Sequence, residues 1–330
     1  MSMPRSRLPL LLLLLPLALA ACDGGGGRMA AALSDDAGGD PAPMPAAPVP
    51  TPDPALPPLL TDQVIVAHRG ASGHAPEHTI PAYDLAIQMG AEYIEQDVLP
   101  TADGVLVCIH DDTLDRTARG PAENCTGNVS DKTLAQLKTC DFGSWFNEAN
   151  PERARPEYEG LQIPTLEEVF QRYGQSAKYY IEIKPNTSTD GSVEQTLLDL
   201  IAEYDLYEGM LAERQVLIQS FIPSSLLNVF TLEPEAPLVQ LYAAGATFTA
   251  PLAASYSFGI GPNTTEVELN PLMVEEAHAL GLAIHPYTIN SEEDLAAMAA
   301  RCVDGLFTNF PDRYRQVLVD NDFGCPAPIR

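Results

Sequence analysis

Residues 93–110, YIEQDVLPTADGVLVCIH, decide which fold this sequence adopts. Two runs in this stretch, 93–98 and 105–110, have the composition of β-strands, and Asp103-Gly104 between them is a strong tight-turn signal. Only six residues separate the two runs, which is too few for a crossover between parallel strands. We therefore expect the first strand to extend past its sheet, turn at Asp103-Gly104 and return antiparallel.

The position of this turn also predicts which residues face each other across the hairpin. We expect Ala102 to lie opposite Val105, and in that register His110 lies opposite Asp97. His110 would then end beside the carboxyl edge of the strand that carries Asp97.

Short β-branched runs alternate with helix-length segments through the rest of the chain, which is typical of parallel strands with helical crossovers. Nine strands are expected, and eight remain once the returning hairpin strand is set aside, so we predict an α/β fold, a TIM (β/α)8 barrel. The predicted strands are 64–67, 93–98, 105–110, 179–184, 215–221, 238–242, 257–261, 283–288 and 305–308. Predicted helices include 79–89, 165–173, 193–203, 271–279 and 292–299.

The composition excludes two classes of protein. Hydrophobic residues make up 45% of the 330 residues, which is enough for a large core and argues against a disordered chain. Lys and Arg number 18 and Asp and Glu number 45, so the net charge of −27 repels nucleic acid phosphates. The acidity is compatible with binding of a divalent cation, although acidity alone more often serves solubility.

The N-terminus has the features of an export signal. Arg5 and Arg7 precede an apolar run at 8–19 that is too short for a comfortable membrane span. The run ends in Leu19-Ala20-Ala21-Cys22, which resembles the bacterial lipobox, so we predict a lipoprotein signal peptide at 1–21 and lipidation of Cys22. An ordinary secretory signal with a chance cysteine is the alternative.

A spacer is expected between the anchor and the barrel. Residues 22–60 are rich in Pro, Ala and Gly and cannot bury apolar surface, whereas residues 61–330 form the predicted barrel domain. We therefore expect an exported bacterial lipoprotein on the periplasmic side of the inner or outer membrane. Asp23 resembles an inner-membrane retention signal of some bacteria.

An exported chain can form disulfides. Cys125 and Cys140 lie close together in a polar stretch and are the favoured pair, and Cys302 with Cys325 would clip the C-terminal tail to the last helix. Cys108 lies within an apolar run and is expected to be a buried free thiol. The sequence alone leaves the connectivity open.

Candidate catalytic residues fall at the carboxyl ends of the predicted strands, where barrel enzymes place their active sites. His68-Arg69-Gly70 closes the first strand. A lone histidine there is usually structural, but with Arg69 it supplies a titratable base and a planar fork for phosphate. His110 ends the hairpin, so two histidines would flank one anion, as displacement at phosphorus requires of a general acid and a general base.

Carboxylates form the second part of the predicted site. Glu95 and Asp97 point to the same face of one strand, and Glu182 with Lys184 repeats this spacing on another. Buried carboxylates repel each other unless a cation neutralises them, so we predict that Glu95, Asp97 and Glu182 hold one hard divalent ion. Lys184 would face an anion; a surface Glu–Lys pair is the alternative for that segment.

These motifs together resemble the glycerophosphodiester phosphodiesterase family. The similar segments run in order along nearly the whole predicted barrel: AHRGASG at 67–73, PEHT at 76–79, IEQDV at 94–98, HDxxLxRT at 110–117, IEIK at 181–184, HPYT at 285–288 and GLFTNFPD at 305–312. Glu-His-Thr in place of the more frequent Glu-Asn-Thr, with His-Pro-Tyr-Thr, resembles the periplasmic branch.

The resemblance implies a small insertion at about 111–160, after the third strand segment and next to the active site. It also implies roles for these residues. His68 and His110 would be the acid/base pair, and Arg69 and Lys184 would hold the phosphate. Glu95, Asp97 and Glu182 would bind one divalent ion, usually Ca²⁺ in the exported branch, with Mg²⁺ as the alternative. Glu77 and His78 would support the site without reacting, and Asn309, which stands where an acid is frequent, would have no metal role.

The sequence therefore predicts an exported, lipid-anchored, metal-dependent hydrolase that cuts glycerophosphodiesters into sn-glycerol 3-phosphate and an alcohol. The resemblance also implies that a glycerol hydroxyl can act as nucleophile and give a cyclic phosphate that water opens. The expected partner is a small-molecule substrate, with membrane contact only through the anchor and no nucleic acid. The alternatives are a phospholipase D-like or phospholipase C-like enzyme on intact or lyso-lipids, and a catalytically silent binding protein.

Overall fold

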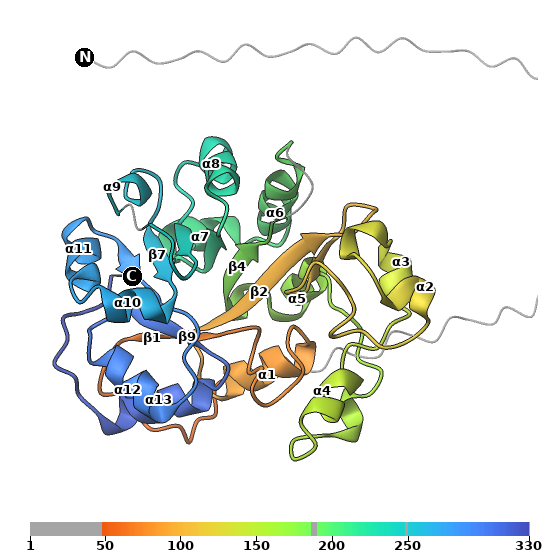
Figure 1. Ribbon diagram of the computed structural model, residues 1–330, viewed down its shortest axis with the longest axis horizontal. Helices are drawn as coiled ribbons and strands as arrows, with labels where there is room; N and C mark the ends of the chain where they lie inside the picture. The colour runs from red at the N-terminus through yellow and green to blue at the C-terminus, as the bar shows by residue number, and fades with distance from the viewer. Residues whose placement is uncertain (1–47, 186–189, 248–249, 330) are drawn as a thin grey trace, which may run out of the picture. The chain divides into compact units, whose positions relative to one another are not determined.

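The computed structural model describes residues 48–185, 190–247 and 250–329 (Figure 1). Within these ranges eight parallel strands form the wall of a barrel in the order β8-β7-β6-β5-β4-β2-β1-β9, with β3 (Leu106–Cys108) as an antiparallel branch on β2. The prediction of a TIM barrel is confirmed. The wall strands are β1 (Val64–Ala67), β2 (Tyr93–Pro100), β4 (Lys178–Ile183), β5 (Val216–Ser220), β6 (Leu238–Tyr242), β7 (Gly259–Pro262), β8 (Ala283–Ile284) and β9 (Gly305–Thr308).

The barrel closes between β8 and β9 through irregular backbone bonds. The amide of Asp304 donates to the carbonyl of Ile284 (3.1 Å), and the amide of Phe307 donates to that of Pro286 (3.0 Å). Strand β8 is shorter than the predicted 283–288 because Pro286 has no N–H to continue a ladder.

Helices surround the strands, as Figure 1 shows. The five predicted helices are found with ends within two residues of the expected ones. The helices outside the insertion are α1 (Ile80–Gln88), α5 (Leu166–Tyr173), α6 (Ser192–Glu203), α7 (Tyr207–Glu213), α8 (Pro223–Leu232), α9 (Ala250–Ala253), α10 (Thr264–Leu269), α11 (Met273–Ala279), α12 (Glu292–Ala299) and α13 (Pro311–Asp320). None of the helices in the described ranges combines the length and the apolar character that crossing a membrane requires.

The predicted hairpin forms, but its register differs from the expected one by one residue. Strand β3 (Leu106–Cys108) pairs with β2 so that Val98 lies opposite Cys108. The amide of Thr101 donates to the carbonyl of Val105 (2.9 Å), which leaves a three-residue loop in which Gly104 takes a positive φ of 83°.

This extra loop residue shifts every pair that follows. The amide of Ile109, and not that of His110, donates to the carbonyl of Asp97 (2.9 Å). The prediction that His110 lies opposite Asp97 is therefore wrong, although His110 still follows the hairpin strand at the carboxyl edge of the barrel.

Residues 111–160 form the expected insertion beside β2 (Figure 1). It contains α2 (Ala122–Cys125), α3 (Leu134–Leu137) and α4 (Ser144–Ala149), and its own apolar cluster includes Leu114, Leu137 and Phe142 packed with Val107 and Ile109 of the hairpin. The insertion is thus anchored to the strand that carries the candidate acids.

Two disulfides are present among the described residues, and they join the pairs that the sequence favours. Cys125 is bonded to Cys140 within the insertion, and Cys302 is bonded to Cys325, which ties the tail to the segment after α12. Cys108 is a buried free thiol.

The predicted signal peptide and Cys22 lie outside the described residues, as does most of the predicted spacer. The last part of that spacer packs on the barrel: the amide of Asp53 donates to the carbonyl of Gln88 (3.1 Å), and the amide of Leu60 donates to that of Leu318 (2.9 Å).

The interior of the barrel has an apolar floor below its carboxyl end. It is formed by Val64, Val66, Tyr93, Tyr180, Leu217, Val239 and Phe307. The rings of Tyr180 and Phe307 meet edge to face with centroids 4.8 Å apart. Since side chains alternate along a strand, the inward positions after Tyr93 and Tyr180 are Glu95, Asp97 and Glu182. These acids therefore lie directly above the aromatic floor.

Gln96 lies between two of these acids but faces the helix layer, and it provides a test of the packing there. Its side chain is fully buried, and neither amide atom has a hydrogen-bond partner among the described residues, while Ile94 and Val98 beside it belong to the apolar core. Because unsatisfied buried polar groups cost about 1–3 kcal/mol, we expect Gln96→Leu to stabilise the protein. Calorimetry should show a rise in Tm of about 2–8 °C.

Gln63 is the matched control for this substitution. It is also buried, but its Nε2 donates to the carbonyls of Ala299 and Val303 (2.9 Å each) and its Oε1 accepts from Tyr314 (3.2 Å). Gln63→Leu should lower the Tm. A Tm below that of the wild type for Gln96→Leu would contradict the packing described above.

Candidate active site

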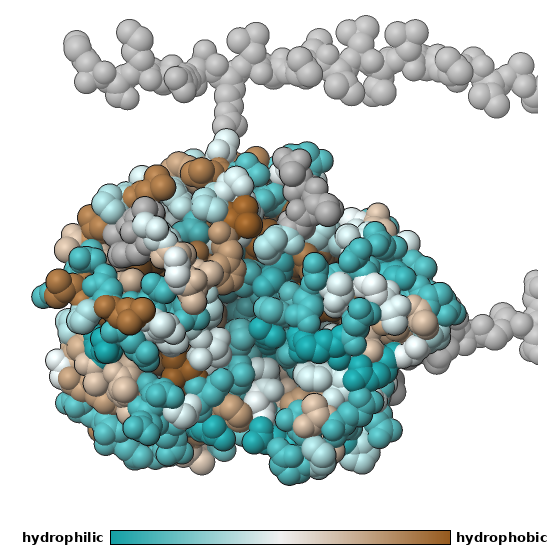
Figure 2. Space-filling model, viewed as in Figure 1, coloured by the Kyte–Doolittle hydropathy of each residue, from teal (hydrophilic) through white to brown (hydrophobic). Residues whose placement is uncertain are grey.

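A cavity of about 340 Å³ opens at the carboxyl ends of the barrel strands. Figure 2 shows the surface hollowed near the middle of the visible face. The described residues that line the cavity are His68, Arg69, Glu95, His110, Glu182, Gln219, Phe221, Leu241, Asn263, Tyr287, Thr288 and Phe307. Five of the residues predicted from the sequence therefore share one cavity, and Asp97 lies buried beside it.

The turn after β1 brings backbone and side chains to the acids. Arg69 and Gly70 have positive φ values of 59° and 80°, and a Cβ on Gly70 would lie 2.7 Å from the carbonyl carbon of Ala82, so only glycine fits there. In this strained conformation the amide of Arg69 donates to Oε2 of Glu95 (2.6 Å). The turn thus fixes one carboxylate with a backbone donor.

His68 is held in one orientation by Asn309, whose Oδ1 lies 2.7 Å from Nδ1 of the imidazole. Burial, together with the charge of Arg69, lowers the pKa of His68 to about 3, so the ring is neutral. Since an amide oxygen only accepts, Nδ1 carries the proton and Nε2 keeps its lone pair. Asn309, for which no metal role was expected, thus orients a candidate catalytic base.

His110 is oriented in the same way as His68, but its hydrogen-bond partner is a carboxylate. Its Nδ1 lies 2.6 Å from Oδ1 of Asp111, and Nε of Arg116 donates to Oδ2 of that carboxylate (2.6 Å). Although burial opposes ionisation, the hydrogen bonds from Arg116 and His110 lower the pKa of Asp111 to about 2. Burial also lowers the pKa of His110, so its neutral ring donates through Nδ1 and has Nε2 as an acceptor.

Glu95, Asp97 and Glu182 are each at most 5% exposed. Burial, followed by repulsion from Asp97, raises the pKa of Glu95 well above its ordinary value and that of Glu182 to about 8. Burial would raise the pKa of Asp97 as well, but the nearby charge of Lys184 and the hydrogen bond from His78 lower it. The buried surroundings therefore do not solvate all the negative charge that three ionised carboxylates would carry.

Two cations lie against these acids. Nζ of Lys184 is 3.0 Å from Oε1 of Glu182 and 3.6 Å from Oδ1 of Asp97, and Nε of Arg69 is 3.6 Å from Oδ2 of Asp97. Arg69 also lines the cavity, as a phosphate-binding residue must. Lys184 instead lies outside the cavity lining that the described residues form, with its ammonium group directed to the acids.

The residues present fit a divalent cation. Oδ1 of Asp97 is buried and accepts no hydrogen bond from the described residues, and Oε1 of Glu182 is buried beside the ammonium of Lys184 (3.0 Å). Carboxylate oxygens are the donors that Ca²⁺ and Mg²⁺ prefer, and a cation would relieve the repulsion that raises the pKa of Glu95 and Glu182.

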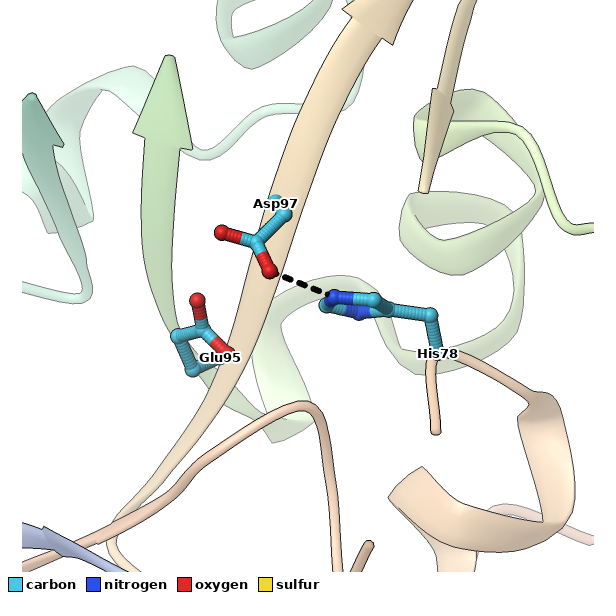
Figure 3. A group of neighbouring side chains, drawn as sticks. All are labelled: His78, Glu95 and Asp97. Atoms are coloured by element: carbon cyan, nitrogen blue, oxygen red, sulfur yellow. Dashed lines mark hydrogen bonds and ion pairs between the residues drawn. The ribbon is translucent and has the colours of Figure 1, made fainter. Parts of the chain in front are cut away.

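His78 lies close enough to be considered as a further ligand, since its ligand atoms and those of Glu95 and Asp97 fall within 4.8 Å of one another (Figure 3). However, its Nε2 is 2.8 Å from Oδ2 of Asp97 and its Nδ1 is 2.9 Å from the hydroxyl of Tyr83. An ionised carboxylate only accepts, so Nε2 donates to Asp97 and Nδ1 accepts from Tyr83. Both nitrogens are thus engaged, and His78 holds Asp97 in place.

Glu77 connects the turn after β1 with the insertion. Its carboxylate accepts two hydrogen bonds from Arg116 (2.8 Å each) and one from Nη1 of Arg69 (3.1 Å). It therefore positions the guanidinium of Arg69 beside the cavity.

Sequence reasoning missed the half of the cavity that strands β5 to β8 provide. Gln219, Leu241 and Asn263 are neutral side chains without a motif of their own, although Gln219 and Leu241 occupy inward positions of β5 and β6 and Asn263 directly follows β7. Counting alternate positions along the predicted strands would have identified Gln219 and Leu241, whereas Asn263 lies beyond the predicted strand 257–261.

Fold and site together define a TIM-barrel enzyme with two histidines and a cluster of buried acids in one cavity. The model of the Glycerophosphoryl diester phosphodiesterase family matches residues 68–313, and this chain belongs to that family. The protein is therefore an enzyme, a phosphodiesterase.

Relatives cover more than three quarters of the chain. A glycerophosphodiester phosphodiesterase of Bacillus subtilis (strain 168) is 43% identical over 265 residues, 78% of this chain and 88% of the relative. The structure of a glycerophosphodiester phosphodiesterase from Agrobacterium tumefaciens has a TM-score of 0.63 at 29% identity and covers 77% of this chain and 99% of that one. The structure of an Oleispira antarctica phosphodiesterase in complex with the product sn-glycerol-3-phosphate has a TM-score of 0.67 at 26% identity, with 78% and 97% covered.

Proposed function

We propose that this enzyme hydrolyses glycerophosphodiesters to sn-glycerol 3-phosphate and an alcohol. Glu95, Asp97 and Glu182 would hold one divalent cation, with Ca²⁺ as the preferred ion and Mg²⁺ as the alternative. The observation that carries the proposal is the placement of His68 and His110 in one cavity with the acid cluster. The Oleispira antarctica relative bound to sn-glycerol-3-phosphate supports this choice of product.

The two imidazoles provide the proton transfers. The family resemblance implies that a glycerol hydroxyl is the nucleophile. In the first half of the reaction, Nε2 of one histidine accepts the proton of this attacking hydroxyl. The other histidine donates a proton to the oxygen of the departing alcohol. In the second half the roles reverse, and water opens the cyclic phosphate. Since both rings are neutral in the free enzyme, one must gain a proton when the anionic substrate binds.

Positive charge stabilises the phosphate during these steps. Arg69 lines the cavity, and Glu77 fixes the direction of its guanidinium, so it would hold a phosphate oxygen. When bound, the cation would supply further charge to offset that developing on the phosphate.

The proposed location is the periplasmic side of a bacterial membrane, with the lipid anchor on Cys22. The basic, apolar and lipobox segments before residue 23 support it. Fractionation of cells that express the full chain tests this placement.

Substrate comparison tests the proposed function. With Ca²⁺ present, we expect rapid release of sn-glycerol 3-phosphate from glycerophosphocholine, and turnover of lysophosphatidylcholine slower by at least about tenfold, since the cavity of about 340 Å³ suits a small molecule. Faster turnover of the lysolipid would favour the lipase alternative. No turnover of either would favour a silent binding protein.

A further inference from the structure

Gln219 is a buried polar residue in the wall of the cavity to which neither the family motifs nor the proton transfers assign a role. It lies on β5, where it pairs with Glu182 of β4 on one side and with Val239 of β6 on the other. The side chain is 2% exposed and lines the cavity, and its Oε1 accepts no hydrogen bond from the described residues. Leaving such an oxygen unsatisfied costs free energy, so a donor from a ligand would stabilise it.

Two other polar groups in this half of the cavity have partners. Oδ1 of Asn263 accepts from the amide of Thr265 (3.0 Å), and the hydroxyl of Tyr287 donates to the carbonyl of Tyr242 (2.9 Å). Apolar Phe221 and Leu241 provide the remaining wall near Gln219. The amide oxygen of Gln219 is therefore a buried acceptor that this wall presents to a ligand.

The position of Gln219 along its strand shows which part of a substrate it can reach. Leu217, two residues earlier, belongs to the apolar floor, and Phe221, two residues later, lies nearer the mouth. Gln219 thus lies deep in the cavity. The moiety that all glycerophosphodiesters share would occupy this enclosed part, and the variable alcohol would face the mouth.

The chemistry of the substrate points to the same moiety. In glycerophosphocholine the glycerol carries two hydroxyl groups, whereas the phosphate is an anion and choline ends in methyl groups. A neutral acceptor beside Glu182 can therefore be satisfied only by a glycerol hydroxyl of this substrate. We propose that Gln219 is a specificity-determining residue whose Oε1 accepts a hydrogen bond from a glycerol hydroxyl. This inference rests on the proposed function, because it assumes a substrate with a glycerol moiety.

Two probes that differ only in their hydroxyl groups test the proposal. We would measure competitive inhibition of the Ca²⁺-loaded enzyme by sn-glycerol 3-phosphate and by n-propyl phosphate. The wild type should bind glycerol phosphate more tightly. Gln219→Leu and Gln219→Met should weaken glycerol phosphate by about 10–100-fold and leave propyl phosphate within about twofold, since a buried acceptor loses its partner only for the first ligand.

Controls separate this role from others. Gln240 is buried on the neighbouring strand, but its amide is satisfied by the carbonyl of Ser220 (3.2 Å) and the hydroxyl of Tyr256 (2.7 Å), so Gln240→Met should keep the preference for glycerol phosphate. Ca²⁺ affinity, measured by calorimetry, should be unchanged in both Gln219 variants. The near-ultraviolet circular dichroism spectra report whether each variant is folded.

Two results would overturn the proposal. One is a preference for glycerol phosphate that survives in a folded Gln219 variant. The other is a loss of Ca²⁺ affinity, which would make the amide oxygen a metal ligand. A wild type that turns over no glycerophosphodiester would instead refute the proposed function, so the two failures are distinguishable.

Discussion

Replacement of His68 or His110 by alanine is expected to lower kcat for glycerophosphodiester hydrolysis by about 10²–10⁴-fold while the protein stays folded. Each ring lines the cavity, is neutral, and donates through Nδ1 to a fixed partner, Asn309 or Asp111, so that Nε2 is left to exchange protons. Steady-state kinetics with glycerophosphocholine, together with circular dichroism, would measure the effect.

His74 is the matched control for both variants. It lies in the same turn as His68, but its Nε2 pairs with Asp312 (2.9 Å) and the ring packs on Phe310, away from the cavity. His74→Ala should therefore retain activity near that of the wild type. Because the two catalytic groups act as a unit, the double variant of His68 and His110 should be little worse than either single variant. Near-normal activity in either single variant would refute its role in proton transfer.

The pH dependence of kcat/KM should reflect the titration of His110. Burial and the charges of Arg69 and Lys184 lower its pKa below the ordinary 6.5. Asp97 and Asp111 oppose this shift but do not cancel it. A base is active only when unprotonated, so His110 acting as the base should make kcat/KM fall as the pH drops through a value below 6.5.

Much of the fold could be predicted because strands and helices leave periodic patterns. The five predicted helices end within two residues of the expected positions, and Thr165 illustrates why: its side chain caps α5 with Glu168 in a capping box that the sequence itself contains. The hairpin register could not be predicted, since Asp103-Gly104 is compatible with loops of two or three residues. The positive φ of Gly104 and the bond from Thr101 to Val105 decide between them.

The charged residues of the candidate site could be predicted from the sequence, because charged side chains stand out on apolar strands. Glu95, Asp97 and Glu182 are acids on otherwise apolar strands, and no packing role accounts for them. Gln219 shares their inward position, but a neutral amide in an apolar strand looks the same in sequence whether or not it is satisfied. Lys184 has the expected spacing, yet only coordinates show that its ammonium pairs with Glu182 at 3.0 Å.

Removal of the divalent cation is expected to abolish hydrolysis and to destabilise the protein. Three buried carboxylates face Arg69 and Lys184, and burial, followed by their mutual repulsion, raises the pKa of Glu95 and Glu182. A chelator should therefore lower activity by at least about 10²-fold, and Ca²⁺ should restore it. At a free Ca²⁺ concentration of 100 times Kd, binding stabilises the folded state by about 2.7 kcal/mol. That gain corresponds to a rise in Tm of about 5–10 °C.

Variants distinguish binding at the acid cluster from binding elsewhere on this acidic chain. Glu95→Gln and Glu182→Gln should lose the Ca²⁺-dependent rise in Tm, because each removes a ligand charge from the buried cluster. Glu194 is the matched control: it is also a buried acid, but it accepts a hydrogen bond from Ser225 (2.6 Å) on the outer helices, so Glu194→Gln should keep the rise. If chelation left both activity and Tm unchanged, Arg69 and Lys184 alone would balance the cluster, and the phosphate would be held without a metal.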